Sequence, residues 1–156
     1  MKKKVRKARK NKDNEKIKIR KARLADVRSC VKIGKTPELT AIYAFTEKQA
    51  IAYLTEYVKK GVLLIAEIEK EIVGFLGAES MLGKFFFVDS LAVKKEKRGY
   101  GIGTALFQQL RKECKKRKMD FIYLTAPLWN KKTIKFYEQL GLKKGKGLID
   151  FYEKIH

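Results

Sequence analysis

Three glycines follow a short apolar segment in the second half of the chain and form a pattern able to hold a phosphate. Leu91-Ala92-Val93 has the composition of a buried strand, and the stretch after it contains Gly99, Gly101 and Gly103. Glycines leave backbone N–H groups accessible, and a helix that begins among them favours an anion through its dipole. Basic side chains add positive charge at the same place, namely Lys94, Lys95, Lys97 and Arg98. The segment therefore predicts a binding site for a phosphorylated cofactor.

The spacing of these glycines distinguishes the segment from two common phosphate-binding loops. The chain contains no Gly-x-x-x-x-Gly-Lys-Ser/Thr run, and its third glycine follows too closely for a G-x-G-x-x-G dinucleotide fingerprint. The run from Arg98 to Gly103 instead reads Arg-x-x-Gly-x-Gly. That pattern resembles the acyl-coenzyme A loop of the GNAT superfamily of N-acetyltransferases. The resemblance implies that the ligand is acetyl-CoA, acting as acyl donor.

The remaining segments predict the elements that must position this loop. Alternating and continuous apolar runs indicate strands at residues 17–20, 62–68, 71–79, 84–93, 121–126, 142–147 and 148–155. Helical spacing, caps and glycine stops indicate helices at residues 22–33, 46–60, 104–118 and 130–140. We expect the strand at 121–126 to be buried and parallel to the one before it, because a helix connects the two. The order β-α-α-β-β-β-α-β-α-β-β is that of an α+β protein.

A second motif makes the resemblance to the GNAT superfamily more specific. Asn130 stands 27 residues beyond Gly103, can cap a helix, and is followed by Phe136-Tyr137-Glu138. The resemblance spans about residues 17–155 and implies a GNAT-like mixed, mostly antiparallel sheet with helices on both faces. It implies that the pantetheine arm lies where the strand at 84–93 splays from that at 121–126. The cofactor-binding residues that it carries over are Leu91, Ala92, Val93, Arg98, Gly99, Tyr100, Gly101, Ile102, Gly103, Thr104 and Asn130.

Two residues are candidates for the acid and the base of acetyl transfer. The resemblance implies that Tyr137 protonates the leaving thiolate, and simple packing beside Phe136 is the alternative. Asp89 shares strand parity with Leu91 and Val93, which predicts that all three side chains face one side of the sheet. An ordinary Asp, with a pKa of about 3.9, is a weak base for an ammonium group. Asp89 therefore needs a hydrophobic setting or a water relay to act as a base, or it only holds the cationic amine.

Two further positions bear on the identity of the base. Glu79, near the end of the preceding strand, is a second candidate. Relatives that acetylate protein N-termini often carry a Glu on the strand before the asparagine motif, where this chain has Thr125. Thr125 cannot act as that base, which counts against a protein N-terminus as the acceptor without excluding it. A protein lysine and a small amine stay open as acceptors as well. The resemblance also implies that a backbone N–H near Leu91 holds the oxyanion.

The composition indicates a folded, strongly basic protein. The 156 residues are 45% hydrophobic and carry a net charge of +21, in a chain of the size of one ordinary domain. The only histidine is His156, so we expect no metal site. Cys30 and Cys114 lie far apart, which predicts buried, unpaired thiols and a cytoplasmic location. No apolar run approaches the roughly 18 residues of a membrane span, so we expect no membrane association.

Positive charge is not confined to the N-terminal residues. Residues 1–16 carry nine Lys and Arg against Asp13 and Glu15 and are expected to form a disordered basic arm before one acetyltransferase domain at residues 17–156. The rest of the chain keeps an excess of fourteen positive charges. Such a surface suits an amine-bearing acceptor on an acidic or nucleic-acid-associated partner, with the enzyme as a monomer or homodimer. The alternative is a non-catalytic acyl-CoA-fold module that binds RNA or a ribonucleoprotein through its basic surface.

Overall fold

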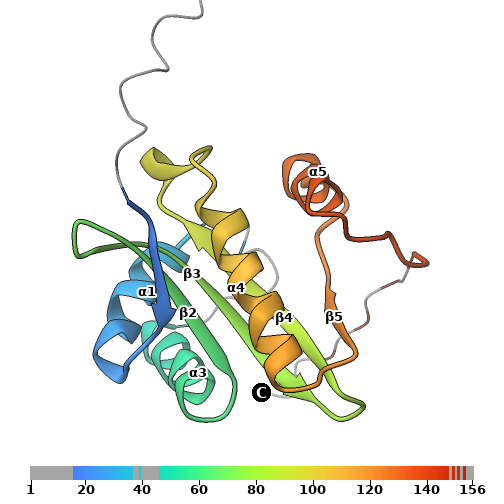
Figure 1. Ribbon diagram of the computed structural model, residues 1–156, viewed down its shortest axis with the longest axis horizontal. Coiled ribbons are helices and arrows are strands. Elements are labelled where there is room, and N and C mark those ends of the chain that lie inside the picture. Colours follow the sequence, from blue (N-terminus) through green and yellow to red (C-terminus); the bar gives the residue numbers. More distant parts are fainter. Residues whose placement is uncertain are drawn as a thin grey trace, which may run out of the picture. The chain divides into compact units, whose positions relative to one another are not determined.

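The computed structural model describes residues 16–36, 39, 46–147, 149, 151 and 153. The chain divides into two compact units, one up to Thr125 and one from Ala126 onward. The described part of the first unit holds the sheet and the helices labelled α1, α3 and α4, and that of the second holds α5 (Figure 1). The predicted basic arm, apart from Lys16, lies outside the described residues.

Five strands of the described residues form one mixed sheet in the order β1-β2-β3-β4-β5. Their bounds are Lys18–Lys21 for β1, Val62–Ile68 for β2, Glu71–Met81 for β3, Phe85–Val93 for β4 and Phe121–Leu124 for β5. Neighbours pair antiparallel from β1 to β4, whereas β4 and β5 are parallel, as the helical crossover between them predicts. Glu69 and Lys70 both have positive φ and form a two-residue turn between β2 and β3, in the gap between the strands predicted at 62–68 and 71–79.

The helices begin where side chains or glycine can cap them. The α-helices are α1 at Val27–Gly34, α3 at Glu47–Lys59, α4 at Ile102–Lys116 and α5 at Lys131–Gln139, and the 3₁₀ turns are η1 at Leu24–Asp26 and η2 at Lys95–Lys97. Thr46, the first residue of the helix predicted at 46–60, caps α3, because its side chain accepts from the Gln49 N–H at 3.2 Å. The helix predicted from residue 22 starts later, since the Asp26 carboxylate accepts from the Arg23 N–H at 2.7 Å and closes a tighter turn first.

Helices cover both faces of the sheet, as predicted. Leu63, Ile65 and Phe75 pack on one face in a buried cluster with residues of α1 and α3. On the other face Leu64 is fully buried and α4 crosses the strands, so that it lies in front of the sheet in Figure 1. Each inner strand therefore buries alternate side chains against a different helix layer, which explains the continuous apolar run of β2.

The far edge of the sheet differs from the sequence prediction. The strand predicted at 121–126 ends at Leu124, and it is not buried, since Phe121 is 52% and Tyr123 40% exposed. In β4 only Phe86 and Val88 of the apolar run are fully buried. The outward aromatic side chains cover one another instead, with 4.8 Å between the ring centroids of Phe85 and Phe121.

The predicted closing pair of strands is not supported by the described residues. Residues 142–147 adopt no strand, and most of the predicted strand at 148–155 lies outside the described residues. The segment 142–147 holds three lysines and two glycines among six residues, and these residue types have low β-propensity. The prediction of a strand at 142–147 was therefore wrong.

Gly61, directly after α3, is expected to tolerate no larger side chain. A Cβ at this position would lie 2.6 Å from the Ala78 carbonyl oxygen and 2.7 Å from Cδ1 of Tyr57. We therefore expect Gly61→Ala to lower the free energy of unfolding by about 1–3 kcal/mol, and the melting temperature by about 3–9 °C. Gly145→Ala is the matched control, because a Cβ there would meet no atom within 4 Å. Equal melting temperatures for the two variants would contradict this packing.

Candidate active site

The strands β4 and β5 form a fork in the sheet. Their pairing runs from Phe85 opposite Phe121 to Val88 opposite Leu124, where β5 ends. β4 continues through Val93 and stays paired with β3 on its other side. In the part of the chain that the structure describes, the last five residues of β4 thus have a strand neighbour on one side only, as the splay implied by the family resemblance requires.

The backbone direction of β4 places hydrogen-bonding groups on this open side. The Lys94 N–H donates to the Val73 carbonyl at 2.8 Å, across to β3. Because alternate residues of an antiparallel strand direct both backbone groups to the same neighbour, those of Leu91 and Val93 point away from β3. The Val93 carbonyl accepts from Nε of Arg98 at 3.0 Å, which holds the glycine loop against the end of the strand.

The glycine loop leads directly into the first turn of α4. Gly99 has φ +83° and Gly101, the residue that caps α4, has φ +79°, a conformation that other residues adopt only with strain. A Cβ at either position would meet no atom within 4 Å, so the backbone conformation and not lack of space requires glycine. Gly101 has no side chain that could bond to the first N–H groups of the helix, a feature that suits the anion site predicted from the sequence.

Asp89 lies at the fork and belongs to a hydrogen-bonded cluster with α3. Its Oδ2 accepts from the Tyr53 hydroxyl, and Oγ of Ser90 lies 3.1 Å from Oδ1. The Tyr57 hydroxyl in turn donates to Tyr53 at 2.8 Å. Burial raises the pKa of Asp89 to about 6, against the opposing effect of the Ser90 hydrogen bond. Asp89 therefore has the hydrophobic setting that a carboxylate needs to become a better base.

A β-bulge gives Asp89 a different orientation from the one its strand parity predicts. Ser90 pairs with Gly77 and Val88 with Ala78, so Asp89 has no partner in β3. Its side chain points to the face covered by α3, where Tyr53 is found. Leu91 and Val93 pair with Leu76 and Gly74 on the face of α4. The prediction that Asp89, Leu91 and Val93 face one side was wrong, because alternation breaks at a bulge.

Glu79, the second candidate base, stands on the same side of the sheet as Asp89 but in an exposed position. It pairs with Phe87, two residues before Asp89. Burial raises the pKa of Tyr57, and the nearby charge of Glu79 raises it further. Glu79 thus lies at the edge of the tyrosine cluster, whereas Asp89 is hydrogen-bonded within it.

The two site residues of the second unit lie together on α5 and its cap. Asn130 caps this helix, since Oδ1 accepts from the Thr133 N–H at 3.2 Å. Tyr137 lies in the third turn, with its ring centroid 5.3 Å from that of Phe136. Burial raises the pKa of Tyr137 to about 12, which keeps the phenol protonated throughout the physiological range. Both the capping role of Asn130 and the packing of Tyr137 beside Phe136 are confirmed, and both remain compatible with a role in the reaction.

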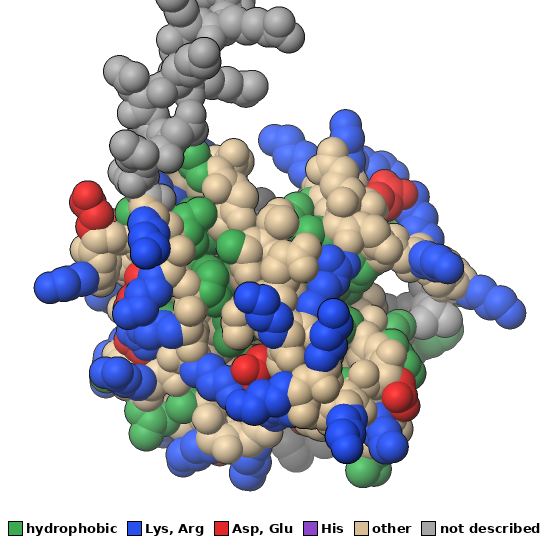
Figure 2. Space-filling model, in the orientation of Figure 1, with side chains coloured by type: hydrophobic (Ala, Val, Ile, Leu, Met, Phe, Trp, Pro, Cys, Tyr) green, Lys and Arg blue, Asp and Glu red, His purple; other side chains and the backbone are tan. Residues whose placement is uncertain are grey.

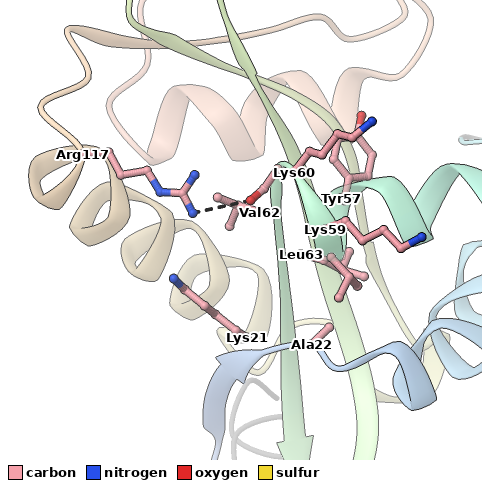
Figure 3. Close-up of a pocket in the computed structure, with 10 residues that line it drawn as sticks. Lys21, Ala22, Tyr57, Lys59, Lys60, Val62, Leu63 and Arg117 are labelled. Atoms are coloured by element: carbon pink, nitrogen blue, oxygen red, sulfur yellow. Dashed lines mark hydrogen bonds between the residues drawn. The ribbon is translucent and has the colours of Figure 1, made fainter.

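Figure 3 draws a pocket that is lined only by residues of the first unit. It has a volume of about 230 Å³ and lies beside the start of β2, with Lys21, Lys59, Lys60 and Arg117 among its lining residues. Arg117 reaches across to the Gly61 carbonyl at 3.5 Å. Tyr57 is the only residue that the pocket shares with the Asp89 cluster, and the pocket contains no predicted site residue.

The described residues contain no group of three or more His, Cys, Asp or Glu side chains placed to bind a metal. Cys30 and Cys114 are buried and unpaired as predicted, and burial raises the pKa of the Cys30 thiol to about 12. Among the same residues no helix is long and apolar enough to cross a membrane.

Sequence reasoning missed Tyr53 and Tyr57. The helix at 46–60 was predicted from its apolar spacing, which comes from Ile51, Leu54 and Val58, and the two tyrosines flank that apolar face. Their spacing of four residues places them on one side of the helix, where their hydroxyls meet. That spacing was the available signal, but the partner in β4 depends on a bulge that the sequence pattern does not reveal.

The chain is similar to acetyltransferases in sequence and fold. Residues 30–142 match the model of the Acetyltransferase (GNAT) family. The chain is 33% identical over 155 residues to an N-alpha-acetyltransferase of Sulfurisphaera tokodaii, covering 90% of this chain and 89% of that protein. An N-alpha-acetyltransferase of Saccharolobus solfataricus is 30% identical over 142 residues, covering 86% of this chain and 84% of that protein.

A solved structure supports the same assignment at the level of the fold. The aminoglycoside N-acetyltransferase AAC(6')-Iy in complex with CoA superposes with a TM-score of 0.75 at 16% identity, covering 91% of this chain and 97% of that one. With the family model matched over most of the chain, the chain belongs to the GNAT family of acetyltransferases and is an acyltransferase.

Proposed function

We propose that this protein transfers the acetyl group of acetyl-CoA to the α-amino group of a polypeptide. The GNAT family uses acetyl-CoA, and both relatives described above are named N-alpha-acetyltransferases. The observation that carries the choice of acceptor is Asp89, a carboxylate at the fork of β4 and β5 whose pKa is raised to about 6.

The cofactor is expected along the open side of β4. Its pantetheine arm would take the place of the missing strand and bond to the backbone groups of Leu91 and Val93. Its pyrophosphate would bind the N–H groups of residues 102–104, at the end of α4 that no side chain caps. The direction of the β4 backbone and the positive φ of Gly99 and Gly101 support this placement. Asn130 is proposed as a further contact, as the family motif implies.

The chemistry needs one base, one oxyanion donor and one acid. Asp89 takes a proton from the ammonium group, directly or through one water, and the neutral nitrogen attacks the thioester carbonyl. As the C–N bond forms, the N–H of Leu91 holds the developing oxyanion. The C–S bond then breaks, Tyr137 donates its phenolic proton to the thiolate, and the nitrogen gives up its second proton to solvent to leave the neutral amide. The proton that Asp89 has gained returns to solvent, and the phenol is reprotonated from there.

The pKa of Asp89 favours an α-amine over a lysine as acceptor. A peptide α-amine has a pKa of about 7.7–8.0, and a lysine side chain has one of about 10.4. A base with a pKa of about 6 is thus some 2 pKa units below the first ammonium group and more than 4 below the second. Proton transfer to Asp89 costs correspondingly less from an N-terminus. This agrees with the names of the two relatives.

The position of Asp89 also offers a replacement for the glutamate that N-terminal acetyltransferases often carry where this chain has Thr125. The last paired residues of the fork are Val88 and Leu124, so the next residues along the chain are Asp89 in β4 and Thr125 directly after β5. Tyr123 stacks on Phe87, on the side of the sheet toward which Asp89 points, and Thr125 follows two residues later in the chain. We propose that the carboxylate which relatives carry on β5 is supplied in this chain from β4.

We also propose that the basic surface attracts an acceptor that is acidic or associated with nucleic acid. Figure 2 shows Lys and Arg side chains over the face that carries α4, and Lys112, Lys115 and Lys116 of this helix are exposed. Family membership and the named relatives favour an enzyme over the non-catalytic RNA-binding module. We propose a cytoplasmic location on the basis of the two unpaired cysteines.

A peptide assay tests the proposed acceptor. Labelled acetyl-CoA is offered with a peptide that has a free N-terminus and one internal lysine, and with the same peptide after chemical blocking of the N-terminus. We expect tandem mass spectrometry to place the label on the α-nitrogen of the first peptide and to find little label on the second. Equal labelling of lysine in both peptides would contradict the proposal for the acceptor and leave acetyl transfer itself intact.

A further inference from the structure

Three hydroxyl groups surround the carboxylate of Asp89. Tyr53 from α3 donates to Oδ2, Ser90 lies at hydrogen-bond distance from Oδ1, and Tyr57 donates to the oxygen of Tyr53 at 2.8 Å. Both oxygens of the carboxylate thus have a hydroxyl partner, and the Tyr53 hydroxyl itself accepts a hydrogen bond from Tyr57. Such a chain fixes the orientation of a carboxylate and stabilises its charged form.

The fold builds this cluster at a position that is closely packed on one side. Tyr57 is only 4% exposed, and its ring packs on β3, where a Cβ at Gly77 would lie 3.3 Å from Cδ2. The rings of Tyr53 and Tyr57 meet edge to face, with 5.0 Å between centroids. Tyr53, which contacts both Tyr57 and Asp89, is 38% exposed.

We propose that Tyr53 is a positioning residue for the reaction, which orients Asp89 and keeps it in the ionised form that accepts a proton. The inference rests on the proposed role of Asp89 as the base. Tyr57 supports Tyr53, because its hydroxyl donates to the Tyr53 oxygen and thereby leaves the Tyr53 proton for the carboxylate.

Two opposing effects act on the charge of Asp89. Burial raises the pKa of the Asp89 carboxyl, whereas hydrogen bonds from the Ser90 side chain and from the backbone lower it. The hydroxyl of Tyr53 also donates to the carboxylate, and a donor to the charged form favours that form. The other titratable groups on this face are Glu79 of β3, the buried thiol of Cys30 in α1, and Tyr123 of β5, which stacks on Phe87. None of these groups donates a hydrogen bond to Asp89 in the described part of the chain. Among the tyrosines, removal of the Tyr53 hydroxyl should therefore change the pKa of Asp89 most.

The test compares Tyr53→Phe with Tyr123→Phe as the matched control. Tyr123 is similarly exposed at 40% and lies on the same face, but makes ring contacts rather than a hydrogen bond to Asp89. In Tyr53→Phe we expect the midpoint of the acidic limb of kcat to rise by about 1 pH unit. At pH 5 this lowers kcat about tenfold, and above pH 8 it changes kcat less than about twofold. Tyr57→Phe should give a smaller change in the same direction, and Tyr123→Phe none.

A second readout does not depend on turnover. The titration of the Asp89 carboxyl carbon, followed by ¹³C NMR in free enzyme, should show the same upward change in Tyr53→Phe. If its midpoint is unchanged, or if it rises while the kinetic limb stays in place, Tyr53 does not position the base and the inference is wrong. If Asp89→Asn keeps the wild-type acidic limb, the assignment of the base itself fails, which is a separate and recognisable result.

Discussion

Replacing Asp89 by Asn is expected to lower kcat for an N-terminal peptide by about 10²- to 10⁴-fold at pH 7, the range typical of a lost general base. An Asn side chain keeps the shape of Asp89 and can still accept from Tyr53, but it cannot take the proton of an ammonium group. At pH 7 most α-amines are protonated. Without Asp89 to accept the proton, only the small neutral fraction of the amine could attack the thioester. Steady-state kinetics with acetyl-CoA and a defined peptide measure the loss.

The pH profile separates loss of the base from a loss of structure. Because the carboxylate is the active form and its pKa is raised to about 6, wild-type activity should be present above this pH and fall below it. In Asp89→Asn that limb should vanish, and the residual rate should rise with pH as the free amine fraction grows. The pKa of Asp89 is higher in the folded protein than in the unfolded chain, so ionisation of this carboxyl lowers the free energy of unfolding as pH rises. The variant Asp89→Asn should therefore melt at pH 7 no lower than the wild type.

Two companion variants decide between positions for the base. Glu79→Gln removes the second candidate, which lies exposed on β3, and a loss there with full activity in Asp89→Asn would reverse the assignment. The double variant Asp89→Asn/Thr125→Glu moves the carboxylate across the fork to the residue directly after β5. We expect it to recover part of the activity lost in Asp89→Asn. No recovery would indicate that the two positions do not serve the same proton.

Replacing Tyr137 by Phe is expected to lower kcat by about 10²-fold or more, since the leaving thiolate would then depart without a proton donor. The phenol has a pKa raised to about 12, so it stays protonated and able to donate over the whole range in which the enzyme is assayed. The ring packing beside Phe136 is retained in the variant, which keeps the helix interior unchanged. The wild-type kcat should accordingly show no loss up to about pH 10 from this residue.

The choice of acyl donor isolates the role of Tyr137. A donor whose thiol has a lower pKa leaves more easily as thiolate and needs less help from an acid. The deficit of Tyr137→Phe should therefore shrink with such a donor, while the deficit of Asp89→Asn should stay the same. An equal deficit with both donors, or full activity of Tyr137→Phe with acetyl-CoA at every pH, would contradict the assignment of Tyr137 as general acid.

Much of the fold follows from local patterns. The bounds of β2, the turn at Glu69 and Lys70, the cap at Thr46 and the cap at Asn130 all depend on neighbouring residues, and the structure confirms each. The glycine loop is equally local, because a left-handed backbone at Gly99 and Gly101 needs glycine whatever surrounds it. These features could be predicted because the residue types in the same short segment determine each of them.

The features that sequence analysis missed depend on contacts between distant segments. The orientation of Asp89 is set by a bulge opposite Gly77, and period-two alternation carries no sign of it. The partner of Asp89 is Tyr53, 36 residues earlier in the chain. The early end of β5 likewise depends on which residues lie beside it, and its apolar composition suggested a longer, buried strand. The candidate base could be named from the sequence, but its surroundings could not.

A crystal structure with a bisubstrate analogue, in which CoA is joined through an acetyl bridge to the N-terminal nitrogen of a peptide, tests the central claim most directly. The pantetheine arm is predicted along the open side of β4, with the bridge carbonyl at the N–H of Leu91. The peptide nitrogen should lie within about 3 Å of the Asp89 carboxylate, or one water away. A complex in which that nitrogen faces a different titratable group, with Asp89 out of reach, would contradict the account.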